Sequence, residues 1–267
     1  MLYIVGLPIG NLEDITLRAL RILKEVDVIA CEDTRNTLKL LNHFEIKKKL
    51  ISYHKFNEKK MLEPIIELLT AGNKVALVSD SGMPLISDPG NILVKSLKEN
   101  GLPYTVIPGA SASLSALVLS GFDSAKFSFV GFLPEKNKDR IALIESVQYL
   151  NQTLIFYISP HSLEKDIETI TQVLGQRKAC LVKEITKIYE SVYDFLLGDE
   201  IEINQKGEFV LIVEGGTEQK PQETNLSVEE QVKEFVKQGF TENQAISKVA
   251  KANDTTKQEL YKMLKVK

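Results

Sequence analysis

Residues 75–90 of this 267-residue chain are VALVSDSGMPLISDPG, a short apolar run that leads directly into a long polar loop. The apolar run, extended to Ser79, has the length and composition of a buried β-strand. The loop from Ser79 to Gly90 contains three serines, two aspartates, two glycines and two prolines, more than a simple connection requires. Ligands of open α/β sheets bind beyond the carboxyl ends of strands. The stretch therefore predicts a strand and a loop for a polar ligand, or, alternatively, a long surface loop that ends in a helix cap.

The first half of the chain alternates short apolar runs with amphipathic stretches. Strands are expected at residues 2–5, 26–30, 50–53, 75–79 and 104–107. Leucines and isoleucines at helical spacing predict helices around 17–23 and 62–69. Asp88 followed by Pro89 is typical of an N-cap and first helical residue, which predicts a helix through Leu97. Strands separated by helices indicate a mainly parallel sheet in an α/β domain of residues 1–121.

A second α/β domain is expected over residues 122–216. Strands are expected at 127–132, 153–158, 179–185, 191–196 and 209–213, and helices at 138–150 and 163–174. Three strands in close succession after residue 178 favour a mixed sheet, because crossover helices between them are missing. Residues 217–226 are polar and contain Pro221, so they are expected to form a linker.

The last segment, residues 227–267, has a purely helical pattern. Ser227 with Glu230, and Thr241 with Gln244, form two capping boxes. Three short helices in about forty residues resemble a helix-turn-helix unit, and a helical lid packed on the main body is the alternative. Six lysines follow residue 247. This basic tail permits a polyanionic partner without requiring one.

The composition suits a soluble globular protein of one large domain or two modest ones, and the lack of a membrane or signal segment predicts a cytoplasmic location. No run approaches the ~18 apolar residues of a transmembrane helix. A signal peptide needs a basic region before its apolar segment, and the apolar residues at the start of this chain have none before them. The net charge of −3 gives no nucleic-acid signal for the whole chain. Cys31 and Cys180 lie in apolar surroundings without ligand spacing, so neither a disulfide framework nor a metal site is expected.

Three further clusters follow predicted strands. GLPIGN at residues 6–11 is not a dinucleotide or phosphate-binding motif and by itself is a tight strand-to-helix turn. EDTR at residues 32–35 places two acids and an arginine at a strand end, where they line a ligand site or cap a helix with a surface ion pair. IPGASA at residues 107–112 consists of small residues that allow close approach of a ligand or tight helix–sheet packing.

The order GLPIGN, EDTR, SDSGMPLISDPG and IPGASA resembles the tetrapyrrole methylase superfamily and, more narrowly, the ribosomal RNA small subunit methyltransferase I family. The similarity continues through YHKFNE at 53–58, GFLP at 131–134, KEITK at 183–187 and GEFV at 207–210. It extends into the C-terminal helices and so covers nearly the whole chain. The long loop together with EDTR is the most specific part, and the glycine turn alone is weak.

The resemblance implies a two-domain fold with an S-adenosylmethionine site in the cleft between the domains, no metal, and commonly a homodimer. It also implies 2′-O-methylation of a cytidine in the decoding region of 16S rRNA, within the small ribosomal subunit. The carboxylate of Asp80 is expected to interact with the methionine or ribose portion of the cofactor. The full set of expected cofactor-binding residues is Pro8, Ile9, Asp80, Met83, Ser111, Ala112, Tyr157 and Val182.

A ribose hydroxyl is weakly acidic, so a base or hydrogen-bond acceptor is expected to assist the transfer. The candidate catalytic residues are Glu32, Asp33, Arg35, Lys183 and Glu184, with His54 as a further possibility. A lysine needs a pKa lowered by burial to act as a base. The chain departs from the family pattern FYEAPHR, since Ile158 and Ser162 replace its glutamate and arginine. This departure concerns substrate recognition more than cofactor binding.

Two other functions are compatible with parts of the sequence. One keeps the fold and methylates a corrin or precorrin ring, but the EDTR and YHKFNE segments and the helical tail favour RNA. The other is a nucleic-acid-binding regulator that only senses S-adenosylmethionine. Its recognition helix should carry base-reading side chains, whereas residues 256–264 offer Gln258 and lysines but no arginine. That composition suits phosphate contacts more than sequence readout.

Overall fold

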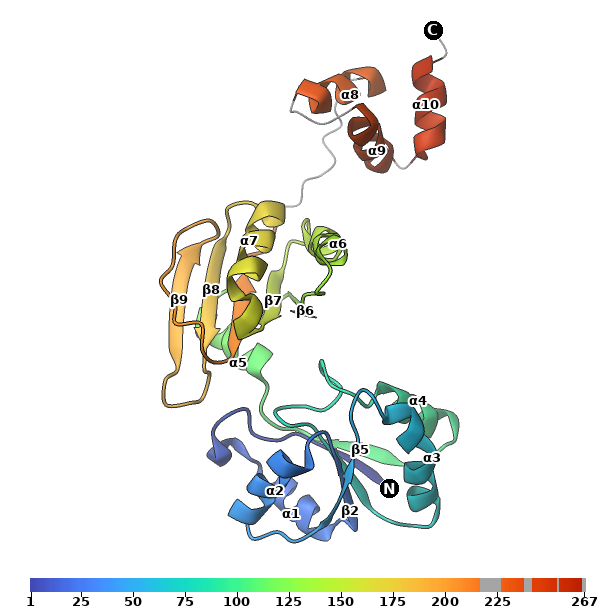
Figure 1. The fold of residues 1–267 in the computed structure, drawn as a ribbon, viewed down its shortest axis with the longest axis vertical. Helices are drawn as coiled ribbons and strands as arrows, with labels where there is room; N and C mark the ends of the chain where they lie inside the picture. Colours follow the sequence, from blue (N-terminus) through green and yellow to red (C-terminus); the bar gives the residue numbers. More distant parts are fainter. Residues whose placement is uncertain (217–226, 238–241, 254, 266–267) are drawn as a thin grey trace. The chain divides into compact units, whose positions relative to one another are not determined.

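The computed structural model describes residues 1–216, 227–237, 242–253 and 255–265. The chain divides into two compact units, residues 1–216 and residues 217–267 (Figure 1). The first unit contains two five-stranded sheets, and the described residues of the second form three helices. The linker expected at 217–226 lies outside the described residues, and the domain boundary expected at residue 121 stays a prediction.

The first sheet is parallel throughout, with strand order β3-β2-β4-β1-β5. Its strands are β1 (Leu2–Val5), β2 (Val28–Cys31), β3 (Lys49–Ser52), β4 (Val75–Val78) and β5 (Tyr104–Ile107). The helices between them are α1 (Leu17–Glu25), α2 (Thr34–His43), α3 (Glu58–Thr70) and α4 (Asn91–Glu99). The parallel α/β architecture predicted from the alternating pattern is confirmed.

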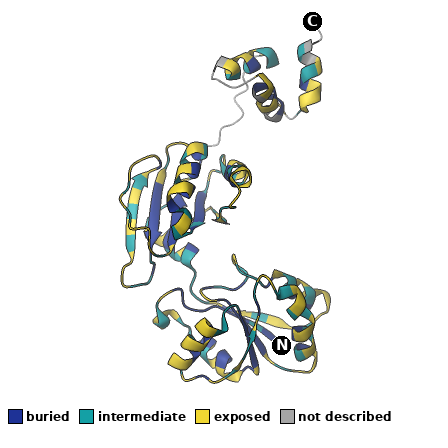
Figure 2. Ribbon diagram, viewed as in Figure 1, coloured by how far each residue is buried: buried dark blue, intermediate teal, exposed yellow. Residues whose placement is uncertain are grey.

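Helices cover both faces of this sheet because the strands are apolar on both sides. Within β1, Val5 packs in one core with Leu23 of α1, while Ile4 packs in the opposite core with Ile65 of α3 and Leu93 of α4. Side chains alternate between the faces of a strand, so one short apolar run serves two cores. The central strands β2, β4 and β1 are buried, whereas the edge strands β3 and β5 are partly exposed (Figure 2).

The second sheet is mixed, with strand order β6-β7-β10-β8-β9. Only β6 and β7 pair in parallel; the other neighbours are antiparallel. The strands are β6 (Phe127–Phe132), β7 (Thr153–Ile158), β8 (Lys178–Lys183), β9 (Ser191–Leu196) and β10 (Phe209–Val213). Helices α6 (Asn137–Val147) and α7 (Leu163–Leu174) pack through Ile144 and Ile170 on one face. The predicted mixed sheet is confirmed.

Helix α5 (Ala112–Ser120) connects the two sheets. It follows β5 of the first sheet, yet its buried residues Ala116 and Leu117 pack with Ile155 and Val210 of the second sheet. This helix therefore covers the second sheet's other face. The segment just before it, residues 108–111, passes from one sheet to the other, as the chain colours in Figure 1 show.

Helix α4 corrects one prediction. It begins at Asn91 after Gly90, so Asp88 and Pro89 do not form its N-cap and first turn. Gly90 has φ +135°, and Leu85 and Ser87 have φ of 73° and 68°. Left-handed backbone at non-glycine residues is sparsely populated and costs about 1–3 kcal/mol each. The loop thus keeps a specific shape up to Gly90, and the helix begins two residues later than predicted.

The second unit contains α8 (Val228–Lys237), α9 (Glu242–Ala252) and α10 (Lys257–Lys265). They share a core that includes Val232, Ile246 and Leu260. The predicted capping box is confirmed, since the Glu230 N–H donates to the Ser227 hydroxyl at 3.3 Å and the Ser227 N–H donates to the Glu230 carboxylate at 2.7 Å. The second predicted box involves Thr241, which lies outside the described residues.

A capping box that the sequence analysis missed starts α10. The N–H of Glu259 donates to the Thr256 hydroxyl at 3.3 Å, and the Thr256 N–H donates to the Glu259 carboxylate at 3.0 Å. The Thr-x-x-Glu spacing was the available signal. Across the described helices of both units, none combines the length and the apolar character needed to cross a bilayer.

Candidate functional site

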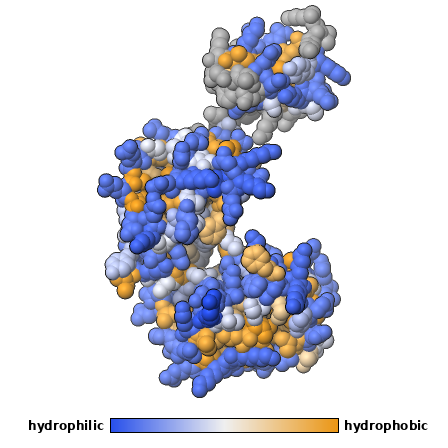
Figure 3. Space-filling model, viewed as in Figure 1, coloured by the Kyte–Doolittle hydropathy of each residue, from blue (hydrophilic) through white to orange (hydrophobic). Residues whose placement is uncertain are grey.

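A cavity of about 340 Å³ lies in the first unit, lined by loops that follow the first sheet's strands, by the start of α5 and by strands of the second sheet. In the space-filling view, the surface of residues 1–216 is hollowed between the two sheets (Figure 3). A volume of this size is typical of small-molecule sites. The lining residues are Ile9, Ser81, Gly82, Met83, Ile86, Ser87, Asp88, Ser111, Ala112, Phe132, Tyr157, Ile158, Ser159, Pro160, Val182, Ile185, Glu208, Phe209 and Val210.

Two glycine turns meet beside this cavity. The N–H of Gly6, after β1, donates to the Ile107 carbonyl at 3.0 Å. A Cβ on Gly109 would lie 2.8 Å from backbone atoms of Gly6, and a Cβ on Gly6 would lie 2.6 Å from the sulfur of Met83. The small residues at 107–112 thus permit tight backbone packing at Gly109, while Ser111 and Ala112 line the cavity. The tight-packing interpretation thus applies at Gly109, and close approach of a ligand at Ser111 and Ala112 stays a prediction.

The loop at residues 79–90 is held in shape by side chains from neighbouring strand ends. Its Asp80 carboxylate accepts hydrogen bonds from the Asp33 N–H at 3.1 Å and from the Asn36 side-chain amide at 2.9 Å. At the other end, the Glu58 carboxylate accepts the Gly90 N–H at 3.3 Å and the Tyr53 hydroxyl at 3.4 Å. The EDTR and YHKFNE segments therefore brace the loop from both sides.

The EDTR motif forms the N-cap of α2. The Asp33 carboxylate accepts a hydrogen bond from the Arg35 backbone N–H at 2.8 Å and pairs with the Arg35 guanidinium at 2.6 Å. The Arg35 side chain is 86% exposed. The hydrogen bonds from Arg35 lower the pKa of Asp33 to about 2. The interpretation as a helix cap with a surface ion pair is thus present in the structure. Glu32, Asp33 and Arg35 are not among the cavity-lining residues, and their catalytic role stays a prediction.

The candidates Lys183 and Glu184 are engaged at the end of β8. Val182 lines the cavity, and Lys183 follows it on the opposite face of the strand, where its ammonium donates to the Asn204 carbonyl at 2.9 Å. The Glu184 carboxylate accepts from the Lys187 ammonium and from the Glu208 N–H, both at 2.8 Å. Burial opposes ionisation of Glu184, but these hydrogen bonds outweigh it and its pKa is lowered.

The other predicted side chains divide between two depressions. Ile9, Met83, Ser111, Ala112, Tyr157 and Val182 line the cavity described above. Pro8 and Asp80 instead border a neighbouring, more open depression that Ile9 also reaches. His54 lies outside both, and its ring Nδ1 accepts the Phe56 N–H at 3.3 Å. The cofactor-binding role of all these residues stays a prediction.

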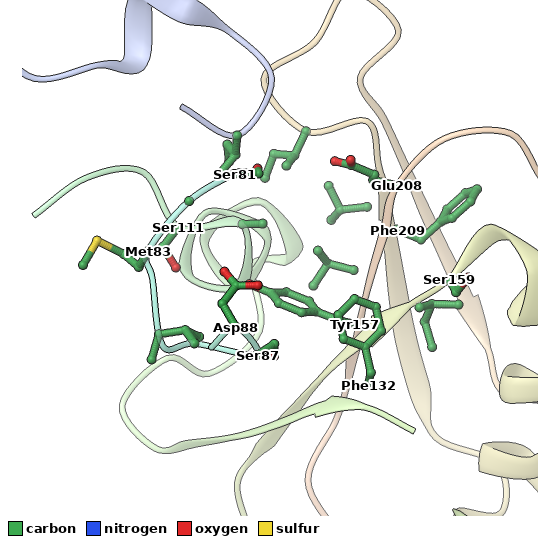
Figure 4. A pocket seen from close by; sticks show the side chains of 18 of the residues that line it. Ser81, Met83, Ser87, Asp88, Ser111, Phe132, Tyr157, Ser159, Glu208 and Phe209 are labelled. Carbon is green, nitrogen blue, oxygen red and sulfur yellow. The ribbon is translucent and has the colours of Figure 1, made fainter. Parts of the chain in front are cut away.

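Sequence analysis missed Asp88, Phe132 and Glu208 as cavity residues. The sequence pattern predicts a helix cap at Asp88, although a second aspartate in a strand-following loop is a usable signal for the site. Figure 4 shows its carboxyl group directed into the cavity, towards Tyr157. Burial, with a contribution from nearby Glu32, raises the pKa of Asp88 to about 6. Tyr157 is flanked by Phe129 and Phe132, with ring centroids 5.0 and 5.3 Å away.

The lining fits S-adenosylmethionine in its chemistry. It includes the carboxylates of Asp88 and Glu208 but no lysine, arginine or histidine. A cationic sulfonium without phosphates needs no basic clamp. Apolar side chains and the hydroxyls of Ser81, Ser87 and Ser111 complete a surface suited to an adenosine and a thioether chain.

Comparison with known proteins places the chain in a family. Residues 1–199 match the family model of tetrapyrrole (corrin/porphyrin) methylases. A protein of Halalkalibacterium halodurans named ribosomal RNA small subunit methyltransferase I is 44% identical, over 97% of this chain and 93% of the relative. The chain belongs to the ribosomal RNA small subunit methyltransferase I family. The Thermotoga maritima member of this family is 43% identical, over 80% of this chain and 98% of the relative.

Solved structures agree with this family's fold. A uroporphyrin-III-C-methyltransferase from Thermus thermophilus superposes with a TM-score of 0.58 at 20% identity, over 80% of this chain and 93% of that one. A diphthine synthase superposes with a TM-score of 0.63 at 15% identity, over 80% of this chain and 89% of that one. At these identities the likeness concerns the fold alone. The predicted tetrapyrrole-methylase-like architecture is confirmed.

Proposed function

We propose that this protein transfers the methyl group of S-adenosylmethionine to the ribose 2′-oxygen of a cytidine in the decoding region of 16S rRNA. The observation that carries the proposal is the cavity, because the GLPIGN turn, the 79–90 loop and the IPGASA segment all contribute to its lining in a member of this family. The expected small-subunit substrate, homodimer and cytoplasmic location are parts of the same proposal.

The chemistry assigned to the protein is mainly positioning. Bound S-adenosylmethionine supplies an activated methyl group, so the enzyme has to align a hydroxyl with it and exclude water. Ser111 and Ala112 stand at the start of α5, and Val182 and Tyr157 stand on the second sheet. Residues on regular elements hold a ligand more precisely than residues on mobile loops. The strained 79–90 loop closes the same cavity.

Nucleoside analysis tests this function. Small subunits from a strain that lacks the gene should contain one 2′-O-methylcytidine fewer than wild-type subunits when their 16S rRNA is digested and examined by mass spectrometry. Incubation with purified protein and S-adenosylmethionine should restore it. If the restored methyl group sits on a base atom or on another nucleotide, the proposed acceptor is wrong.

The C-terminal unit is proposed to bind RNA and not the cofactor. The described lysines Lys248, Lys257 and Lys262 are exposed on α9 and α10, and phosphate contacts by lysine are independent of sequence. The Thermotoga maritima relative supports a separate role, since 98% of its length aligns with only 80% of this chain. Nearly all of the relative is aligned, so it has no counterpart for about a fifth of this chain, yet it carries the same name as the longer relatives.

Truncation after Gly216 is expected to leave cofactor affinity within about 3-fold while lowering the methylation of small subunits about tenfold or more at 0.15 M salt. Loss of several phosphate contacts weakens RNA binding, and low salt should partly compensate for it. Calorimetry and filter-binding assays measure the two effects. Impaired cofactor binding by the truncated chain would make the helices part of the cofactor site, and undiminished methylation would leave them without this role.

A further inference from the structure

We infer that Asp88 is the proton acceptor of the methyl-transfer reaction. The inference rests on the proposed function, since it assumes that the acceptor is a hydroxyl group. None of the candidates selected from the sequence has this position: Asp88 lies within the cavity itself, on the loop that closes it (Figure 4).

The geometry distinguishes Asp88 from the other carboxylates nearby. The Asp80 carboxylate accepts two hydrogen bonds from the α2 terminus, and the Asp33 carboxylate is paired with Arg35. Glu208, the other acid in the lining, is paired with the Lys187 ammonium at 3.1 Å. Within the described part of the chain, no cation lies within ion-pairing distance of Asp88. The Asp88 carboxylate therefore has no counter-ion among those residues, and it is directed into the cavity (Figure 4).

The shape of the loop fixes this direction. Leu85 and Ser87 adopt left-handed backbone conformations on the way to Asp88, and Leu85 packs against Gly90 so closely that a Cβ there would lie 2.9 Å from it. Strain of this kind persists only where the surroundings impose it, and it is concentrated at functional sites. Here Asp88 follows the strained turn, and its carboxylate is directed towards Tyr157 (Figure 4).

The electrostatic surroundings make Asp88 a better base than an ordinary carboxylate. Burial is the main reason that its pKa rises to about 6, and the negative charges of Glu32 and Asp80 add to the effect, while the Ser79 hydroxyl opposes it. A catalytic group works best when its pKa lies near the working pH. Asp88 is mostly ionised at pH 7 and still binds a proton about a hundredfold more tightly than an exposed aspartate does.

The step balances with groups already named. The ribose oxygen forms a bond to the methyl carbon as the bond between that carbon and sulfur breaks, and its electron pair goes to sulfur. The hydroxyl proton passes to the Asp88 carboxylate and then to water. One proton is released per methyl group, and neither an oxidant nor a metal is required.

The test compares Asp88→Asn with wild type in single-turnover methylation of unmethylated small subunits, together with calorimetric binding of S-adenosylmethionine. We expect a rate about 100- to 10,000-fold lower, with cofactor affinity within about 3-fold. The wild-type rate should rise with pH to a plateau with a midpoint near 6, and the variant should lack this rise. Asp139→Asn, the same change at an exposed residue of α6 outside the cavity, should behave as wild type.

A second readout needs neither RNA nor cofactor. Because the folded-state pKa of Asp88 lies above its ordinary value of 3.8, ionised Asp88 opposes folding, and this effect grows as pH rises from about 4 through about 6. Asp88→Asn should therefore melt at a higher temperature than wild type at pH 8 and show no such gain at pH 4. A variant that is more stable but inactive has not lost activity through unfolding.

Chemical rescue completes the design. Asp88→Ala should be slow, and added formate should restore part of its rate by entering the vacated space as a replacement carboxylate. Unchanged single-turnover rates in Asp88→Asn would overturn the inference while leaving the proposed function intact. A defect confined to cofactor affinity would also overturn it, since Asp88 would then be a binding residue. A wild-type protein that methylates no ribose oxygen would overturn both proposals.

Discussion

Replacing Asp166 by asparagine is expected to lower the free energy of unfolding by about 3–5 kcal/mol, among the largest effects of any conservative change in this protein. Asp166 on α7 lies 3.3 Å from Nε of Arg140 on α6, and both side chains are only 4% exposed. Asparagine keeps the shape but removes the charge, which leaves the Arg140 guanidinium buried without its counter-ion. Unpaired charge in an apolar interior is far more costly than a lost neutral hydrogen bond.

Urea unfolding monitored by circular dichroism measures this effect. Glu168→Gln is the matched control, because Glu168 lies on the same helix, is exposed, and accepts the Gln172 amide through an oxygen that glutamine retains. It should change stability by less than about 0.5 kcal/mol. The double variant Arg140→Met/Asp166→Asn should recover much of the loss. A double variant as unstable as Asp166→Asn would show that the unpaired charge is not the cause.

One of the two positions where the chain departs from its family pattern, residues 158 and 162, contacts this pair. The Ser162 hydroxyl donates to the Asp166 carboxylate at 2.6 Å, and Ile158 is buried in the same core as Leu163. Where the family pattern has an arginine, this chain has a serine that hydrogen-bonds to Asp166, and where it has a glutamate, this chain has an isoleucine buried in the apolar core. Any contact that the family's arginine makes must be supplied here by another residue.

Most of the fold followed from the sequence because apolar periodicity reports burial directly. The strands at 127–132 and 153–158 and the helix at 163–174 occur with the predicted bounds. The start of α4 was wrong because the local signal of Asp88 and Pro89 was overridden by the backbone of the loop. The placement of α5 was inaccessible for a related reason: its apolar residues indicate burial, but nothing in them indicates which of two sheets they contact.

The sequence indicates which segments form the site, but it does not indicate which individual side chains of those segments line the cavity. The 79–90 loop contains two aspartates, and the sequence analysis selected Asp80 for the ligand. In the structure, Asp80 braces α2 and Asp88 is directed into the cavity. The choice depends on the left-handed turns at Leu85 and Ser87, and no residue type at those positions signals such a conformation. Tertiary contacts decide which of the two carboxylates lines the cavity.

Replacing Ala112 by leucine is expected to weaken S-adenosylmethionine binding about 100-fold or more. Ala112 is the first residue of α5 and lines the cavity. The helix cannot retreat to make room, since Ala116 and Leu117 in its next turn are buried against the second sheet. Overfilling a packed site typically costs about 1–3 kcal/mol, and the upper end of that range corresponds to about a 150-fold loss of affinity.

Calorimetry measures the affinity, and thermal unfolding checks the fold, which leucine should preserve because it is a good helix former. Ala125→Leu is the matched control, an identical change at an exposed residue outside the cavity, and should bind as wild type does. Asp80→Asn tests the neighbouring depression in the same assay. Retained affinity in Ala112→Leu together with a loss in Asp80→Asn would move the cofactor to the depression beside Pro8, because only a ligand seated there would ignore a side chain that fills the larger cavity.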